Sequence, residues 1–361
     1  MAFMSSDTAP ASRVGLDTNN TSAGVDSLFL KVFSGEILTA FETATVMKSL
    51  HTIRTLKSGK SASFPVTGIA DSAYHTVGES IVENGTSYLS DIGKTEKQIF
   101  IDDMLISSTF LANVDELKNH YDIRSIYAAE LGKALAKRFD IATMKTLWAA
   151  TGTSANLTNA GGTRLSGSDL STTQNIIDAL FAIATQLDEN DAPSEGRFAI
   201  MTPKTYYQLL TSDNSAINHA VSSEYGNGGN VATGTIPQVA GISLIKSNHL
   251  KHIADLGDQT TNTDGDGSSA VKNDVTGSGS GSGYESDFSA LKDDNSTSSD
   301  PTDDTYGILA GTPQAIGTVK LLDLATESEY QIERQGTLFV AKYMMGHGVL
   351  RPECAVAFKV S

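Results

Sequence analysis

One helical segment, residues 113–150, limits most strictly what this chain of 361 residues can fold into. At about 1.5 Å per residue, one helix of that length would span on the order of 50 Å, which is long for a compact domain. Gly132 lies inside the segment and is expected to weaken the helix locally. Apolar residues recur every three or four positions and predict one buried stripe, formed by Leu117, Tyr121, Ala128, Leu131, Leu135, Phe139 and Ala142.

Most of the negative charge is concentrated in one segment. The chain has 26 Lys and Arg against 42 Asp and Glu, a net charge of −16, of which residues 255–304 contribute −10. A chain with this balance does not hold nucleic acid through its overall charge. Residues 255–305 are also rich in Gly and Ser and poor in large apolar residues, which predicts a solvated surface loop. A calcium loop is disfavoured, because Asn273 stands where a bidentate glutamate is needed.

No arrangement of residues indicates a catalytic site. Gly59-Lys60-Ser61 matches the end of a phosphate-binding loop, but Arg54 stands where the loop needs its first glycine, and Pro65 disfavours the helix that should follow. His249 and His252 have no further metal ligands at fitting spacing. We therefore predict no catalytic residue, no cofactor and no metal, which makes a soluble enzyme a poor alternative.

Cysteine content and hydropathy bound the environment of the chain. Cys354 is the single cysteine, which excludes an intrachain disulfide, and its strand-like surroundings predict a buried, inert thiol. No apolar run approaches the roughly twenty residues of a membrane span, and no secretory leader opens the sequence. We expect no membrane partner and a chain that remains in the compartment where it is made.

Strands are predicted on both sides of the helical segment. Residues from about 50 to 102 read as strand and turn, an extended two-stranded excursion in which Ile99 and Ile101 share one face and Phe100 the other. Such a ribbon is marginal alone in water. Residues 171–247 alternate helix and strand and indicate a small α/β unit. The last 55 residues return to strands, and the apolar residues on both faces of 338–343 predict a sheet that is covered on both sides.

The N-terminal region combines a polar arm, residues 1–26, with an abrupt apolar segment that contains Phe29, Phe33, Ile37 and Phe41. An apolar segment that follows a loose arm often lies on a neighbouring molecule. The arm, the two-stranded excursion and the long helix therefore share one property. Each is predicted to bury its apolar surface on other copies of the chain, as in the subunit of a closed shell.

Several segments carry a resemblance to a known family. They are LFLKVFSGEILTAFETATV, SGKSASFPV, NHYDIRS, GTVKLLDLA and AKYMMGHGVLRPECAVAFKV. Together they resemble the major capsid proteins of T7-like short-tailed bacteriophages (podoviruses), from about residue 28 to residue 361 and most weakly between about 150 and 315. The acidic Gly/Ser-rich insertion appears longer than this family leads us to expect.

The resemblance implies an α+β chain with the Hong Kong 97-type capsid fold. It assigns the chain to five parts: an N-terminal arm (1–45), an extended loop (46–102), a peripheral domain (103–169) with a spine helix (113–150), an axial α/β domain (170–318) with the insertion 255–305, and C-terminal strands (319–361) that complete the peripheral domain. We hypothesise contacts between subunits at Phe29, Phe33, Arg54, Lys57, Lys60 and Phe64. Gly59 is expected at a bend, and Pro65 is expected to protect a strand edge.

The same resemblance implies a major capsid protein made in the bacterial cytoplasm and located in the virion. Its copies would form hexamers and pentamers of an icosahedral head around double-stranded DNA, with a scaffolding protein, a portal at one vertex and a possible decoration protein as partners. Procapsid maturation by expansion is implied as well, without the covalent crosslinking of some related shells. The alternative is a phage tail or fibre-like structural protein, suggested by the Gly/Ser repeats at 277–283.

Overall fold

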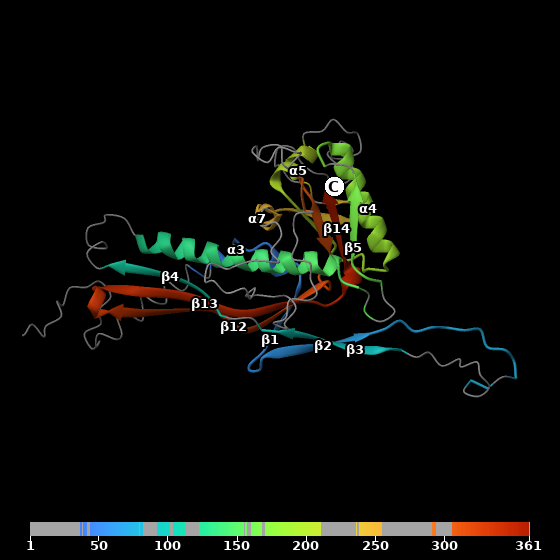
Figure 1. Ribbon diagram of the computed structural model, residues 1–361, viewed down its shortest axis with the longest axis horizontal. Coiled ribbons are helices and arrows are strands. Elements are labelled where there is room, and N and C mark those ends of the chain that lie inside the picture. The colour runs from blue at the N-terminus through green and yellow to red at the C-terminus, as the bar shows by residue number, and fades with distance from the viewer. Residues whose placement is uncertain are drawn as a thin grey trace, which may run out of the picture. The chain divides into compact units, whose positions relative to one another are not determined.

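The computed structural model forms two compact units. Unit 1 comprises Met1–Thr45, Leu105–Ala136 and Asp323–Tyr343, and unit 2 comprises Val46–Met104, Lys137–Leu322 and Met344–Ser361. Three long elements have residues in both: α3 (Ile123–Thr151), β12 (Ile316–Gln331) and β13 (Gly336–Val349) (Figure 1). The structure describes residues 37, 39–41, 44–78, 80–81, 92–101, 104–112, 123–154, 156, 160–167, 170–210, 236, 238–254, 291–293 and 305–360.

Unit 1 contains an antiparallel pair of strands. Strand β4 (Leu105–Ala112) pairs with β13 so that Ala112 lies opposite Gly336 and Leu105 opposite Tyr343. Alternate residues of β13 from Phe339 to Tyr343 are buried, whereas Leu338 and Val340 on the other face are half-buried. Ile106 and Phe110 of β4, which lie opposite Lys342 and Leu338, are exposed. The sequence predicts a sheet covered on both faces. Within this unit, only one face of the β4–β13 pair is fully buried.

The apolar segment after the arm packs on its own chain. Residues 37, 39–41 and 44 are helical, Ile37 and Phe41 are buried, and the rings of Phe41 and Tyr343 are 6.2 Å apart. A Cβ placed at Gly132 would lie 2.7 Å from Ala40 Cβ and 2.8 Å from the Ile37 carbonyl oxygen. The expectation that Ile37 and Phe41 lie on a neighbouring molecule was wrong, and Gly132 serves close helix packing within unit 1.

Helix α3 is buried differently along its length. In unit 1 Ala128, Leu131 and Leu135 form the predicted stripe. In unit 2 the stripe prediction was too narrow, because most of residues 139–151 are buried and Ala142 is only half-buried. The predicted helix start at 113, with Leu117 and Tyr121, lies outside the described residues.

Unit 2 contains a six-stranded sheet of order β5-β14-β11-β6-β8-β7. Helix α4 (Thr173–Glu189) contacts β14 and β5 (Figure 1) and begins after Thr172, whose hydroxyl accepts from the Asn175 amide. Helix α5 (Pro203–Leu210) follows β6 and begins at the proline. The strands are β5 (Thr163–Gly167), β6 (Phe198–Met201), β7 (Gln238–Val239), β8 (Ile242–Lys246), β11 (Ile308–Gly311) and β14 (Ala355–Val360). The predicted α/β character of residues 171–247 is therefore confirmed for the described part of that range.

Two further strand pairs of unit 2 come from residues 50–101. Strand β1 (Thr52–Thr55) runs parallel to β12, and Thr52 lies opposite Gly317. Strands β2 (Ser61–Thr67) and β3 (Lys94–Phe100) form an antiparallel pair, hereafter the β2–β3 ribbon (Figure 1). This pair confirms the predicted two-stranded excursion.

Short elements complete the description. They are the 3-10 helices η1 (Met47–Ser49), η4 (Ile332–Arg334) and η5 (Pro352–Cys354), helix α7 (His249–Ala254), and the short pair β9 (Lys292–Asp293) and β10 (Thr305–Tyr306). Within the described ranges, no helix has both the length and the apolar character needed to cross a membrane. Phe29, Phe33 and most of the insertion 255–305 lie outside the described residues.

Replacing Gly132 by alanine tests the packing of residues 37–44 on α3. The added Cβ overlaps Ala40 and the backbone of Ile37, so we expect Gly132→Ala to lower the free energy of unfolding by about 1–3 kcal/mol, despite alanine's higher helix propensity. Thermal unfolding followed by circular dichroism measures the change. Lys133→Ala, at the exposed neighbouring position, should change stability by less than about 0.5 kcal/mol. A stabilised Gly132→Ala variant would contradict the close packing.

Candidate functional site

The stretch between β2 and β3 exposes large apolar side chains. Tyr74 and Val77 are 102% and 98% exposed, and Ile69, Ile81 and Ile92 are also exposed. The described part of this stretch has no helix or strand that buries them. Exposed apolar side chains gathered in one segment mark a surface that another molecule covers. Sequence reasoning missed these five residues, because each stands singly among polar neighbours and follows no helix or strand period.

Arg54 and Phe64, two of the predicted contact residues, are brought together by the fold. The Arg54 guanidinium lies 5.5 Å from the centre of the Phe64 ring, and its Nη1 donates to the Ser63 carbonyl oxygen at 3.1 Å. Arg54 therefore links β1 to β2 within the subunit. Lys57 and Lys60 are exposed in the turn before β2, where Gly59 has a φ of +117°. The bend expected at Gly59 is confirmed, and a strand follows where a phosphate-binding loop would need a helix.

The root of the β2–β3 ribbon has a small core of its own. Ala62 and Ile99 from the ribbon are buried together with Val319 of β12 and Leu350, which follows β13. Leu56, Phe64 and Ile101 pack around them, and the Ile101 amide donates to the Lys60 carbonyl oxygen at 2.9 Å. The excursion is therefore supported at its root by its own chain, which corrects, for Ala62 and Ile99, the expectation that its apolar surface is buried on other copies.

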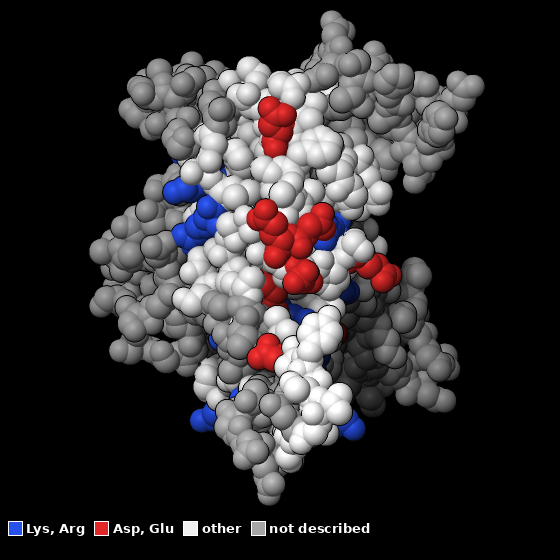
Figure 2. Space-filling view, turned by 90° about the vertical axis from the view of Figure 1, so that its right-hand side faces the viewer, with Lys and Arg blue, Asp and Glu red and all other residues white. Residues whose placement is uncertain are grey.

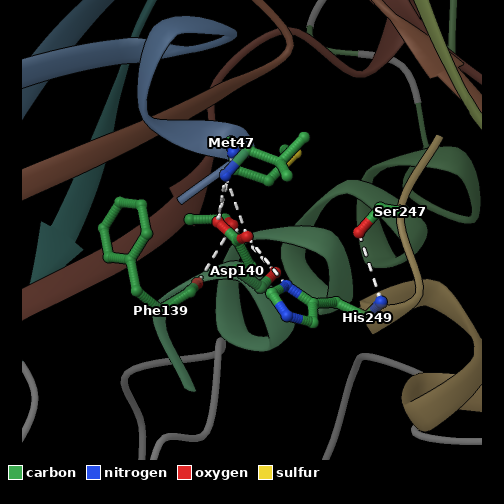
Figure 3. A network of polar contacts seen from close by, with 7 residues as sticks. Met47, Phe139, Asp140, Ser247 and His249 are labelled. Atoms are coloured by element: carbon green, nitrogen blue, oxygen red, sulfur yellow. Dashed lines mark hydrogen bonds and ion pairs between the residues drawn. The ribbon is translucent and has the colours of Figure 1, made fainter. Parts of the chain in front are cut away.

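The carboxylate of Asp140 connects three segments of unit 2. The backbone amide of Val46 donates to Oδ2 at 2.9 Å, and the amide of Met47 donates to Oδ1 at 3.1 Å. The His249 ring, at the start of α7, donates through Nδ1 to Oδ2 at 2.9 Å. Figure 3 shows the carboxylate between Met47 and His249, and its residue is 0% exposed. Asp140 thus joins α3 to the chain before β1 and to α7.

Two histidines, the buried His51 and the half-buried His347, extend this polar network towards β12 and β13. The Met47 carbonyl oxygen can only accept, so the proton of neutral His51 is on Nδ1, at 2.6 Å from that oxygen. His51 Nε2 then accepts from the Thr318 hydroxyl at 2.7 Å, and the Thr318 oxygen accepts from His347 Nδ1 at 2.9 Å. The direction of every hydrogen bond in this chain is therefore fixed while both rings are neutral.

Desolvation keeps both rings neutral. Desolvation lowers the pKa of His51 from 6.5 to about 4; the Met47 carbonyl and the charge of Asp140 oppose this effect, and the charge of Lys320 adds to it. Desolvation lowers the pKa of His347 from 6.5 to about 3, and the neighbouring His51 adds to this. Phe139 packs against both rings, with ring centroids 5.8 Å from His51 and 5.5 Å from His347.

Among the residues that the structure describes, no group of three or more His, Cys, Asp or Glu side chains is arranged to hold a metal ion. His249 bonds to Asp140, and the side chain of His252 lies outside the described residues. Cys354 is buried, as predicted, and burial raises the pKa of its thiol. A buried protonated thiol is a poor nucleophile.

Figure 2 looks at the side of the molecule on which α4 lies in Figure 1, and acidic side chains gather there. Asp188, Glu189, Asp191 and Glu195, at the C-terminal end of α4 and just beyond it, are all exposed. Asp188 forms an ion pair of 2.7 Å with the buried Arg197. The surface therefore carries negative charge outside the acidic insertion, and it repels phosphate groups over about 10 Å at ordinary salt.

Comparisons with known proteins identify a family and relatives of this chain. A family model described as "Gp10A-like: Major capsid protein" matches residues 63–295 and 271–359. The major capsid protein of Escherichia phage T7 is 32% identical over 354 residues, covering 92% of this chain and 92% of the relative. That of Enterobacteria phage T3 is 32% identical over 347 residues, covering 92% and 91%.

Solved structures show the same relationship. The capsid structure of the cyanophage P-SCSP1u superposes with a TM-score of 0.66 at 34% identity, covering 98% of this chain and 99% of that one. The mature capsid of bacteriophage PhiM1 gives a TM-score of 0.61 at 16% identity, covering 88% and 87%, which supports the fold alone.

The α+β fold, with the long helix α3, the neighbouring long strands β12 and β13 and the β2–β3 ribbon, is that of the Hong Kong 97-type capsid proteins, which build phage heads. Within that class, the chain belongs to the Gp10A-like family of major capsid proteins. It is a structural protein of the virion rather than an enzyme, and its copies form a homo-oligomeric shell. The tail or fibre alternative is thereby set aside.

Replacing Asp140 tests its role as a junction. In Asp140→Ala, two backbone amides and the His249 ring lose a buried acceptor, so we expect a loss of about 3 kcal/mol or more in unfolding free energy. Asp140→Asn retains one acceptor oxygen and should lose less. Guanidinium unfolding can be followed by the fluorescence of Trp148, the single, fully buried tryptophan. Asp178→Ala, an exposed site on α4, should stay within about 0.5 kcal/mol; an equal loss there would contradict a specific role for Asp140.

The two neutral histidines predict a dependence of stability on pH. Between pH 6.5 and about 4, the unfolded chain binds more protons than the folded chain, so the free energy of unfolding falls as the pH falls. This contribution is fully present above pH 6.5, and at pH 5 the loss is at most about 2 kcal/mol per histidine. Unfolding midpoints measured from pH 7 to pH 4.5 should show this slope, and His51→Gln should reduce it. An unchanged slope in His51→Gln would contradict the assignment.

Proposed function

We propose that this capsid protein assembles through the stretch between β2 and β3, which docks on a neighbouring copy. The observation that carries the proposal is the exposure of Tyr74, Val77 and their apolar neighbours in a chain whose family forms homo-oligomeric shells. Burying a large apolar side chain contributes about 1.5–3 kcal/mol. Repeated over every subunit of a shell, a few such contacts are enough to favour assembly.

The family's domain roles map onto the chain as a proposal. Residues 1–45 act as the N-terminal arm, 46–102 as the extended loop, 103–169 with 319–361 as the peripheral domain, and 170–318 as the axial domain. In this scheme the spine helix contains α3, and the six-stranded sheet with α4 belongs mainly to the axial domain. The axial domains would meet at the centres of hexamers and pentamers.

The contact residues proposed from the sequence divide into three groups. Lys57 and Lys60 are exposed and form no ion pair with another described residue, so both remain available to a neighbouring subunit. Arg54 and Phe64 are used within the subunit, so we propose that they hold the ribbon in place for docking. Phe29 and Phe33 remain proposed contacts of the arm.

The partners are those that a closed head requires. We propose a scaffolding protein during assembly, a portal at one vertex, a possible decoration protein, and double-stranded DNA enclosed without sequence-specific binding. The net charge of −16 suits a wall that does not adhere to packaged DNA. Expansion of the procapsid would reorient the arm and the spine helix by rigid-body movement.

Polar substitutions between β2 and β3 test the docking. In Tyr74→Ser/Val77→Ser, the subunit should keep its stability within about 0.5 kcal/mol, because both side chains are exposed. Closed particles should fall at least tenfold when the variant is coexpressed with its scaffolding protein and counted by negative-stain microscopy. His75→Ser, in the same stretch, changes an exposed side chain that is already polar and should assemble normally. A normal yield of closed heads from the double variant would overturn the proposed docking.

A further inference from the structure

Gly346-His347-Gly348 in β13 meets different parts of unit 2 on its two faces. Successive residues of a strand point to opposite faces, so the two glycines share one face and His347 occupies the other. The three residues lie within AKYMMGHGVLRPECAVAFKV, one of the segments that carry the resemblance described above. The fold gives this segment a physical explanation.

On the glycine face, β3 approaches too closely for any side chain. A Cβ placed at Gly346 would lie 1.9 Å from the Phe100 carbonyl oxygen, and one placed at Gly348 would lie 2.7 Å from Ile99 Cγ1. A Cβ at Gly317 of β12 would lie 3.3 Å from Ile99 Cδ1 and 2.7 Å from Leu350 Cδ1. Interiors are close-packed, so a side chain at these positions forces a neighbour to move. The end of β3 lies directly against these three glycines, Gly317, Gly346 and Gly348, which we call the seat of β3.

The two main contacts differ in kind. At Gly346 the obstacle is backbone, which can move only if β3 itself moves. At Gly348 the obstacle is the Ile99 side chain, which a smaller residue would remove. This difference allows the seat to be tested separately from general packing.

On the opposite face, His347 joins β13 to the buried polar chain. Its Nδ1 donates to Thr318 of β12, and the chain continues through His51 to the Met47 carbonyl oxygen. The Met47 amide in turn donates to Asp140 of α3. One short strand segment therefore connects the root of the ribbon to the second half of the long helix.

We propose that Gly346-His347-Gly348 is a positioning segment that sets the direction in which the β2–β3 ribbon leaves the subunit. The inference rests on the proposed function, in which the end of the ribbon reaches a neighbouring copy. From Phe100 to Lys94 the ribbon extends about 20 Å, so a tilt of about 10° at the seat displaces the far end by about 3.5 Å. A close-packed contact does not survive a displacement of that size.

Spin labels measure the ribbon's direction independently of assembly. Thr67, at the far end of β2, and Ala182, on α4, are both exposed in unit 2, and Cys354 is too buried to react. Full-length chain carrying Thr67→Cys and Ala182→Cys is labelled before assembly, and electron–electron double resonance gives the distance between the labels. Gly346→Ala and Gly348→Ala should each shift this distance by about 3 Å or more.

Ile99→Ala separates positioning from packing. Added to Gly348→Ala, it should restore the original distance, because it removes the atoms that the new Cβ meets; added to Gly346→Ala, it should not. Unchanged distances in both folded glycine variants, or equal rescue of both, would overturn the proposal. If the glycine variants fail to fold, Ile99→Ala alone empties the seat without overlap and should broaden the distance distribution; an unchanged width would overturn it as well.

Assembly of the same variants distinguishes the two proposals. Gly348→Ala should give at least tenfold fewer closed particles on coexpression with the scaffolding protein, and Gly348→Ala/Ile99→Ala should recover most of them. A shifted distance with a normal yield of particles would leave the seat standing and reject the docking role of the ribbon.

Discussion

The buried carboxylate of Asp140 is the constraint on which the other connections of unit 2 depend. A carboxylate that is shielded from solvent needs hydrogen-bond donors around it. The Asp140 carboxylate accepts hydrogen bonds from the amides of Val46 and Met47 and from the ring of His249. These donors belong to segments far apart in the sequence. Fixing Met47 also fixes its carbonyl oxygen, to which His51 donates, and from there the polar chain reaches Thr318 and His347.

The ribbon and the polar chain meet at β13. A subunit of a shell must present its contact surfaces in a fixed direction, while the contacting side chains themselves remain uncovered until a neighbour arrives. The structure separates these two requirements. Rigidity comes from the seat at Gly346 and Gly348 and from the small core around Ile99, whereas Tyr74 and Val77 stay exposed beyond them.

Much of the fold is predictable from the sequence, because periodicity and helix signals are local. The alternation around Ile99, the pairing of β2 with β3 and the α/β character of residues 171–247 all appear in the structure as expected. Long-range packing was not predictable in this way. Ile37 and Phe41 were expected on a neighbour, yet they pack on their own chain, because nothing in the local pattern shows that Gly132 leaves room for them.

The amino-acid sequence alone determined the family, the element types and the absence of a catalytic pattern, because these depend on residue identity and short spacing. Only the tertiary structure decided what each unusual residue does. Asp140 appears in the sequence as one polar residue in a helix, and Gly346 and Gly348 appear as breaks in a strand. Their roles depend on atoms more than ninety residues away for Asp140 and more than two hundred for the glycines, and such contacts arise only once the chain has folded.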